Sequence, residues 1–362
     1  MGWKQMLSFG KRELLGLDIG SSAVKAVRLR KDGAGYTVTA AGIAEIAPAT
    51  ASCEADGGIE DNNHRRIIII KKAIRECLAS TDRKAKLAVC GLSGPEVAVR
   101  DFEFPLLSTS EIDGAVSFEV SQVCPFNAAE SAVDYHLIPN GDDKTRGIKT
   151  RGILVAATNA LIKSKEKLVK ESALKCVLMD VEGLALLNCF KGLADESQES
   201  TTAILNVGGS GITVAIMGGN GRPFIRDMTF AGDDIIEQIA ADKVMSTEDV
   251  KEILSADSTA PKTELHDSLE KACLKLIVNV SETLRYYAAQ KQSTPVEKIF
   301  VCGGFALTKG FVELLNSRLG AEALLWNPFE KIPCDAAQQL GDICDKRGPA
   351  LAVAAGLAMR TI

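Results

Sequence analysis

Asp18-Ile19-Gly20-Ser21-Ser22 stands between two apolar segments, residues 13–17 and 23–30, and this stretch decides the fold. Its pattern indicates a strand, a tight glycine turn and a second strand, and a third strand is expected over residues 36–46. Together these strands predict an antiparallel meander. A helix is expected after it at residues 65–80, where apolar side chains recur at helical spacing.

The same order of elements returns in the second half of the chain. Residues 202–206 predict a strand, Val207-Gly208-Gly209-Ser210-Gly211 a glycine turn, and residues 212–217 and 223–230 two further strands. A helix is expected next, at residues 233–242. Duplication at this scale predicts two related lobes that face each other.

Two stretches interrupt these lobes. Residues 92–174 alternate strand-like and helix-like segments without the meander pattern and indicate a small α+β insertion. Residues 247–290 indicate a helical insertion, and the polar linker Asp195–Ser200 marks the change of lobe. An alanine-rich helix is expected at residues 350–359, directly after Pro349.

Length and composition exclude several classes of protein. At 362 residues the chain exceeds what one core usually serves, and its formal net charge of −5 argues against nucleic acid or anionic lipid as the main partner. Zinc sites and a Ser-His-Asp triad are poorly supported, because the ten cysteines form no Cys-x-x-Cys pair and only three histidines are present. Residues 1–12 lack the features of a signal peptide and fit a tail that is frayed or docked on its own domain, or else a weak interfacial anchor.

The first glycine turn has the groups that a nucleotide and its metal ion need. Gly20, Ser21 and Ser22 let successive backbone N–H groups converge on a phosphate oxygen. Asp18 can reach Mg²⁺ through water, because this hard cation keeps much of its hydration shell. Lys25 lies where its ammonium can reach toward the β-phosphate. Taken alone, the motif fits an ordinary hairpin turn equally well.

Two later glycine segments strengthen this interpretation. Gly208-Gly209-Ser210 is expected to hold the phosphates from the opposite lobe. Gly303-Gly304-Phe305 follows a buried strand, where glycines let the backbone lie against adenine or the α-phosphate. A Gly-Gly pair by itself is more often a turn than a site.

Further segments carry a resemblance to a known family: Pro125-Phe126 with Asp134-Tyr135, Arg226 with Ala231-Gly232-Asp233, Ser281-Glu282-Thr283-Leu284-Arg285, Trp326-Asn327-Pro328-Phe329 and Ala355-Gly356-Leu357-Ala358-Met359-Arg360. Together with the glycine segments they cover nearly the whole chain in order. The chain resembles the PilM family, the cytoplasmic actin-like proteins of type IV pilus assembly, within the actin, Hsp70 and FtsA superfamily.

The resemblance implies an α/β fold of the actin type, with duplicated RNase H-like lobes, an FtsA-type 1C insertion and a helical 2B subdomain. The implied boundaries are subdomain 1A at 13–91 and 175–200, 1C at 92–174, 2A at 201–245 and 293–345, 2B at 246–292, and a C-terminal helix closing on 1A at 346–362.

The resemblance also implies a site for ATP or ADP with Mg²⁺. Glu248 and Lys251 would contact ribose and adenine, and Glu182 would position the attacking water. From the residues alone, the first two also fit an exposed helix ion pair, and Glu182 fits a carboxylate in the first turn of a helix. Asn206 departs from the superfamily, which usually has aspartate there. Because an amide brings no charge, Mg²⁺ binding and hydrolysis are both expected to be weak.

The implied partner is the N-terminal cytoplasmic peptide of PilN, an inner-membrane protein, in a groove between 1A and 1C. The resemblance thus implies a cytoplasmic protein held at the inner face of the membrane through this partner. Pilus motor ATPases and self-association are further expectations. Phe102, Phe104 and Phe126 are groove candidates, although they also fit the insertion's own core.

The leading hypothesis is therefore a nucleotide-dependent scaffold with slow ATP hydrolysis or none. The alternative is a small-molecule kinase or phosphotransferase on the same superfamily fold, which needs a carboxylate base beside the γ-phosphate. Asp180 or Glu182 fits that role, but no sugar-pocket signature accompanies them.

Overall fold

The computed structural model describes residues 13–33, 35–47, 59–81, 86–138, 149–193, 201–218, 221–255, 265–290, 293–335 and 338–361. The N-terminal segment 1–12 and the linker 195–200, for which the sequence makes predictions, lie outside these ranges.

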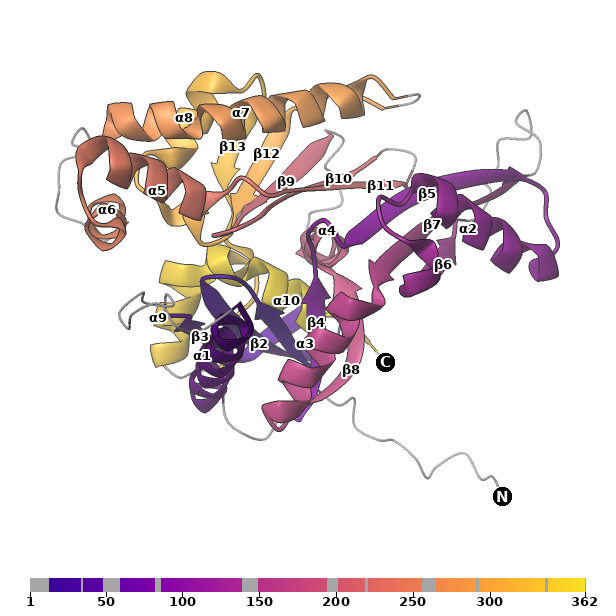
Figure 1. Cartoon of the computed structure of the whole chain (residues 1–362), viewed down its shortest axis with the longest axis horizontal. Coiled ribbons are helices and arrows are strands. Elements are labelled where there is room, and N and C mark those ends of the chain that lie inside the picture. Colours follow the sequence, from indigo (N-terminus) through magenta and orange to yellow (C-terminus); the bar gives the residue numbers. More distant parts are fainter. Residues whose placement is uncertain are drawn as a thin grey trace.

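Two five-stranded sheets of the same topology form the centres of the two lobes (Figure 1). The first contains β1 (Leu15–Ile19), β2 (Ala23–Asp32), β3 (Gly35–Glu45), β4 (Leu87–Leu92) and β8 (Lys175–Val181), in the order β3-β2-β1-β4-β8. The second contains β9 (Thr202–Val207), β10 (Ile212–Met217), β11 (Pro223–Met228), β12 (Lys298–Cys302) and β13 (Glu322–Leu325), in the order β11-β10-β9-β12-β13. In each sheet an antiparallel meander of three strands is followed by two parallel strands. The predicted duplication is confirmed.

A third sheet forms an insertion that projects to one side of the lobes in Figure 1. It contains β5 (Val97–Pro105), β6 (Ser131–Leu137) and β7 (Lys149–Thr158) in the order β5-β7-β6, with α2 (Thr109–Val123) packed on it. Ile112, Val116 and Val120 face the sheet from α2 and bury its apolar side. We call this sheet and helix the insertion.

Helices cover both faces of the first sheet. Alternation along β1 places Leu15, Leu17 and Ile19 on one face, where α1 (Ile59–Ala79) and α3 (Asn159–Glu171) pack against them. On the other face lie α4 (Glu182–Leu193) and α10 (Ala352–Ala358), and α10 follows the 3₁₀ turn that begins at Gly348. Side chains of both helices belong to one buried cluster with residues of the second sheet, and α4 contacts β10 and β11 directly, so the pair lies between the two lobes.

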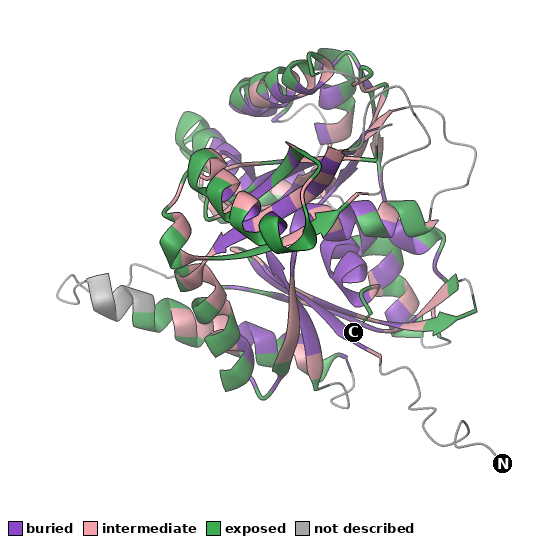
Figure 2. Ribbon diagram, turned by 90° about the vertical axis from the view of Figure 1, so that its right-hand side faces the viewer, coloured by how far each residue is buried: buried purple, intermediate pink, exposed green. Residues whose placement is uncertain are grey.

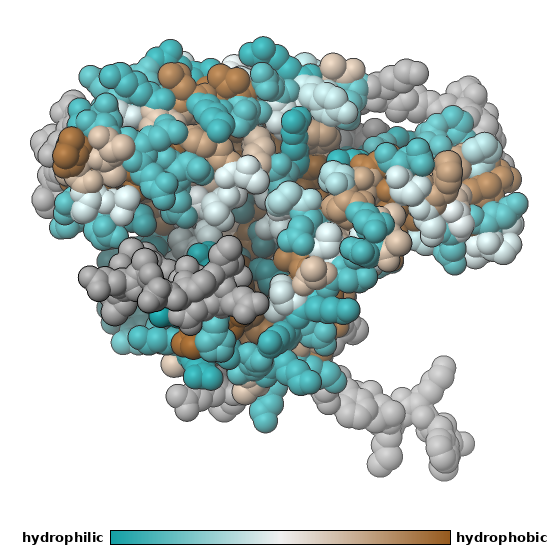
Figure 3. Space-filling view, viewed as in Figure 1, coloured by the Kyte–Doolittle hydropathy of each residue, from teal (hydrophilic) through white to brown (hydrophobic). Residues whose placement is uncertain are grey.

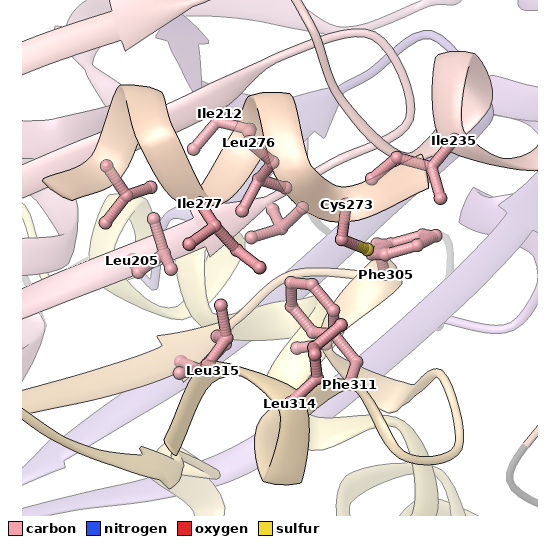
Figure 4. Packing of buried hydrophobic residues seen from close by; sticks show 14 of the residues in the cluster. Leu205, Ile212, Ile235, Cys273, Leu276, Ile277, Phe305, Phe311, Leu314 and Leu315 are labelled. Carbon is pink, nitrogen blue, oxygen red and sulfur yellow. The ribbon is translucent and has the colours of Figure 1, made fainter. Parts of the chain in front are cut away.

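The second sheet has its own helical cover. It consists of α5 (Gly232–Lys243), α6 (Thr247–Leu254), α7 (His266–Ala288) and α8 (Phe311–Arg318). Figure 4 shows Leu276 and Ile277 of α7 pointing toward Leu314 and Leu315 of α8. Figure 2 shows that the strands are mostly buried, while the outer helix faces are exposed. The helical insertion expected at 247–290 is thus confirmed as α6 and α7 in its described part.

The sequence did not predict α9 (Gln338–Arg347). Only Leu340 and Cys344 of this polar helix are buried, and they pack against the cluster between the lobes. In the described part of the chain, no helix is long and apolar enough to span a membrane.

Candidate functional site

The two glycine turns, Gly20–Ser22 and Gly208–Gly211, meet in space. The backbone N–H of Ser210 donates to Oγ of Ser21 at 3.1 Å, although the two residues are 189 positions apart. Gly209 lies so close to the first turn that a Cβ there would stand 2.9 Å from Oγ of both Ser21 and Ser22. A larger residue at position 209 would have to displace these two hydroxyls and also Oδ2 of Asp233, which would stand 2.6 Å from the added Cβ.

Each turn is closed by the same backbone hydrogen bond. The N–H of Gly20 donates to the carbonyl of Ala23 at 3.1 Å, and the N–H of Gly208 donates to the carbonyl of Gly211 at 2.9 Å. This equivalence follows from the duplicated meander, in which both turns join the first two strands of their sheet. The two turns are thus related elements that face each other across the lobes.

A pocket of about 270 Å³ lies between the lobes at this point. Its lining from the first lobe and the segment before the insertion comprises Asp18, Ile19, Gly20, Ser21, Ser22, Lys25, Ser93, Gly94, Pro95 and Glu182. The second lobe contributes Asn206, Gly208, Gly209, Ser210, Gly211, Ile212, Thr213, Asp227, Met228, Thr229, Gly303 and Gly304. All but three of the site residues predicted from the sequence are therefore brought together in one pocket.

Asp18 and Lys25 form an ion pair in the pocket wall. They are direct cross-strand neighbours on β1 and β2, and Nζ of Lys25 donates to Oδ2 of Asp18 at 3.0 Å. Burial lowers the pKa of Lys25, but attraction to Asp18 and Glu182 and the hydrogen bond to Asp18 outweigh it, so the pKa is raised overall. Lys25 is therefore a permanent cation at neutral pH, held in place by the predicted metal-binding residue.

Glu182 is a buried carboxyl group at the junction of β8 and α4. Burial and the negative charge of Asp18 raise its pKa to about 7, while Lys165 and a hydrogen bond from Ser93 oppose the shift. Gly91 makes room for it, because a Cβ there would stand 2.8 Å from Cγ of Glu182. The other carboxylate considered for catalysis, Asp180, is absent from the pocket lining and pairs with Arg360 at 3.2 Å.

Sequence reasoning missed several residues of the pocket wall. Asp227 accepts hydrogen bonds from Oγ1 of Thr213 at 2.6 Å and from the N–H of Gly94 at 2.8 Å. Ser93 and Gly94 follow β4, and Gly94 has a φ of 97°, which favours glycine. The available signal for Asp227 was a carboxylate inside the predicted strand 223–230, where charged side chains are uncommon unless they are paired or exposed.

Three predicted residues lie elsewhere. Glu248 and Lys251 are exposed on α6. Phe305 is buried in the core of the second lobe, with its ring centroid 4.9 Å from that of Phe311 (Figure 4). None of the three lines the pocket. Their nucleotide contacts remain predictions.

The pocket residues fit a phosphate-bearing ligand with a hydrated cation. Turns closed around Gly20 and Gly208 present backbone to the pocket, and an added Cβ at Gly304 would meet no atom within 4 Å, so that wall is open. Among the described residues, no group of three or more His, Cys, Asp or Glu side chains is placed to hold a metal ion. Asp18 in the pocket lining suits Mg²⁺, because this ion keeps several waters and needs only one or two protein carboxylates beside phosphate oxygens.

Comparisons with solved structures show which fold this arrangement belongs to. The PilM–PilN type IV pilus biogenesis complex matches with a TM-score of 0.77 and 23% identity, over 97% of this chain and 98% of that chain. The ethanolamine utilization protein EutJ from Carboxydothermus hydrogenoformans matches with a TM-score of 0.55 and 14% identity, over 96% and 89%. A nucleotide-free diol dehydratase-reactivating factor matches with a TM-score of 0.50 and 11% identity, over 96% and 99%.

These likenesses show an actin-like ATPase fold, as the sequence predicted. The family model for the type IV pilus assembly protein PilM matches residues 16–362. Because this match covers nearly the whole chain, the chain belongs to the PilM family of type IV pilus assembly proteins.

Proposed function

We propose that this protein binds ATP–Mg²⁺ between its lobes and, as a cytoplasmic component of type IV pilus assembly, binds the N-terminal cytoplasmic peptide of a PilN-type inner-membrane partner. One observation carries the nucleotide part: the turns at Ser21 and Ser210 touch across the lobes and wall one pocket. A triphosphate in this pocket contacts both lobes at once and favours the closed arrangement.

The chain's own residues have distinct roles in this proposal. The two glycine turns donate backbone N–H groups to phosphate oxygens, and Lys25 adds a positive charge. Asp18 holds Lys25 in place and accepts hydrogen bonds from water bound to Mg²⁺. Bound ATP–Mg²⁺ supplies the phosphate charges that join the two turns.

Hydrolysis is slow or absent in this proposal because Asn206 lacks the negative charge that the superfamily usually has at this position. The pocket therefore suits a ligand that stays bound better than one that turns over quickly.

Support for the partner comes from the similar PilM–PilN complex and from the surface of the insertion. Phe102, proposed for the groove from the sequence, is only 3% exposed and belongs to the insertion's core. Leu106 and Phe118 are 64% and 67% exposed, and Figure 3 shows apolar side chains on the surface of this part of the molecule. An apolar peptide side chain would find its contacts among such exposed residues.

Calorimetric titration with ATP, with and without Mg²⁺, tests the nucleotide part. In wild type, Mg²⁺ strengthens ATP binding. In Asp18→Asn the gain in ATP affinity that Mg²⁺ gives falls by at least about tenfold, because the carboxylate that holds the metal's waters is lost. Asp32→Asn, which alters an exposed ion pair with Arg30, serves as the control and keeps the wild-type gain. An unchanged gain in Asp18→Asn would remove Asp18 from the metal site.

Titration with a synthetic peptide tests the partner. The peptide copies the cytoplasmic N-terminus of the organism's PilN-type protein, and binding is measured with ATP–Mg²⁺ present. Heat from nucleotide but none from peptide would favour the kinase alternative over the scaffold. Phe118→Ser should weaken peptide binding if this exposed ring belongs to the groove, whereas Leu274→Ser, an exposed apolar residue on α7, is the control.

A further inference from the structure

Asp227 is a partly buried carboxylate whose two oxygens bind different lobes. It stands at the inner end of β11, directly opposite Thr213, which is itself directly opposite Asn206. Oδ1 accepts from the Thr213 hydroxyl within the second sheet, and Oδ2 accepts from the N–H of Gly94, 133 residues away. Burial raises the pKa of Asp227, against the effect of these two hydrogen bonds.

Gly94 connects the pocket with the insertion. The segment from Ser93 to Glu96 is the whole link between β4, in the first sheet, and β5, at the edge of the insertion. Ser93 hydrogen-bonds Glu182 with its side chain. Asp227 belongs to the second lobe and holds this short link. One end of the link contacts Glu182, and the other end leads into the insertion.

The opposite end of β11 is fixed to the same strand of the insertion. Arg222, just before β11, donates to Asp101 at 2.8 Å and to Glu103 at 2.9 Å, and both acceptors lie on β5. In Figure 1, β11 and β5 lie side by side, and contacts between the two strands agree with the picture. The insertion is thus attached to the second lobe at both ends of β11, by a partly buried hydrogen bond at the pocket and by exposed ion pairs away from it.

Building on the proposed nucleotide site, we propose that Asp227 is a positioning residue that couples occupancy of the pocket to the orientation of the insertion through its hydrogen bond to Gly94. A ligand held by both glycine turns favours the arrangement in which the turns are in contact, and so fixes the second lobe against the first. Because Asp227 joins the second lobe to the link before β5, the insertion is fixed with it. Nucleotide then changes the affinity of the insertion for a partner that binds it. By thermodynamic linkage, that partner changes the affinity for nucleotide by the same factor.

Hydrogen exchange of the full-length protein tests this coupling. Each variant is saturated with ATP–Mg²⁺ according to its own titration, so that a change in affinity does not enter the comparison. In wild type, nucleotide should slow exchange at the glycine turns and also, by at least about fivefold, in β5. Asp227→Ser keeps a hydroxyl near Thr213 but is too short to reach Gly94. It should keep the slowing at the turns and lose it in β5.

Asp227→Asn separates hydrogen bonding from charge. The amide oxygen still accepts from Gly94, and the Thr213 hydroxyl can turn to accept from the amide nitrogen, so β5 should respond as in wild type. A β5 response that persists in Asp227→Ser, or is lost in Asp227→Asn, overturns the proposal. If wild type binds no ATP in the titration, the proposed function falls and this inference with it. If wild type binds ATP but β5 does not respond, only the inference falls.

Discussion

At the scale of single residues, the pocket is nearly symmetric but its charges are not. Asp18 and Lys25 are cross-strand neighbours in the first sheet, and Asn206 and Thr213 occupy the equivalent positions in the second. One lobe thus presents an ion pair where the other presents an amide beside a hydroxyl. The second lobe's carboxylate lies one strand further on, at Asp227. The asymmetry predicts that Mg²⁺ is held mainly from the first lobe.

Asn206→Asp should restore the charge that the superfamily usually has at this position. We expect a larger gain in ATP affinity from Mg²⁺, together with faster phosphate release, because a second carboxylate can then bind the metal's waters. Without Mg²⁺ the variant should bind ATP more weakly than wild type, because the added charge repels the phosphates. Titrations with and without Mg²⁺ and a phosphate-release assay measure these effects. Unchanged Mg²⁺ dependence would show that Asn206 does not limit metal binding.

Glu182 should make stability depend on pH. Its pKa is raised from 4.5 to about 7 in the folded protein, so the folded state binds its proton more tightly than the unfolded state. Ionising Glu182 therefore lowers the free energy of unfolding. This loss is absent below about pH 4.5, grows as pH rises, and is complete above about pH 7. Glu182→Gln carries no such loss. Its unfolding free energy relative to wild type should rise with pH, by up to about 3 kcal/mol.

Urea denaturation of both proteins at several pH values gives this difference, and other titrating groups cancel to first order. Parallel pH profiles would show that Glu182 is ionised normally in the folded state. The same measurement with ATP–Mg²⁺ present would show whether the ligand changes the proton affinity of this carboxyl group.

At the scale of elements, α10 makes two close backbone contacts, and each of them has a glycine on one side. A Cβ at Gly16 of β1 would stand 2.0 Å from the carbonyl oxygen of Ala354, and a Cβ at Gly356 would stand 2.2 Å from that of Ala185 on α4. The helix therefore packs backbone to backbone against the strand that leads into Asp18. This contact ties the position of the first glycine turn to the helix between the lobes.

Gly16→Ala should destabilise the protein by at least about 2 kcal/mol, because α10 must move away from β1. Gly114→Ala on α2 is the matched control: nothing lies within 4 Å of the added methyl group, so the better helix former should stabilise by up to about 1 kcal/mol. Urea midpoints measure both changes. A Gly16→Ala protein as stable as wild type would contradict the close contact.

The elements also show what the sequence can and cannot predict. Both meanders and the glycine turns were predictable, because alternation and turn chemistry are local. The hydrogen bond between Asp227 and Gly94 joins residues 133 positions apart, and no local pattern marks it. The sequence did not predict α9, because only two side chains of this polar stretch are buried, and their burial depends on tertiary contacts. Phe305 follows the predicted glycines directly, but the 3₁₀ turn after Gly304 directs its ring into the core.

At the scale of the whole molecule, one cluster of buried side chains belongs to both lobes. It unites α4 and α10 with residues of both sheets, among them Val89 in β4 and Ile204 in β9. Two other clusters belong to one lobe each. The shared cluster predicts that the lobes unfold together even without ligand, because separating them would expose its apolar surface.

Trp326 can report on this cluster. It is 9% exposed, and its ring meets that of Phe190 on α4 edge to face at 5.5 Å between centroids. The chain has two tryptophans, so Trp3→Phe leaves Trp326 as the only one. In this variant, the urea transition seen by tryptophan fluorescence should coincide with the one seen by far-UV circular dichroism, as expected for a single cooperative unit.

ATP–Mg²⁺ should shift both transitions together, by about 2.7 kcal/mol at roughly one hundred times its dissociation constant. The shift must be shared, because a ligand that contacts both glycine turns stabilises only the state in which both lobes are folded and closed. A fluorescence change at lower urea than the loss of helix would instead mean that the lobes part before either unfolds. In that case the cluster around α4 and α10 would act as a hinge, and the nucleotide should bring the two transitions together.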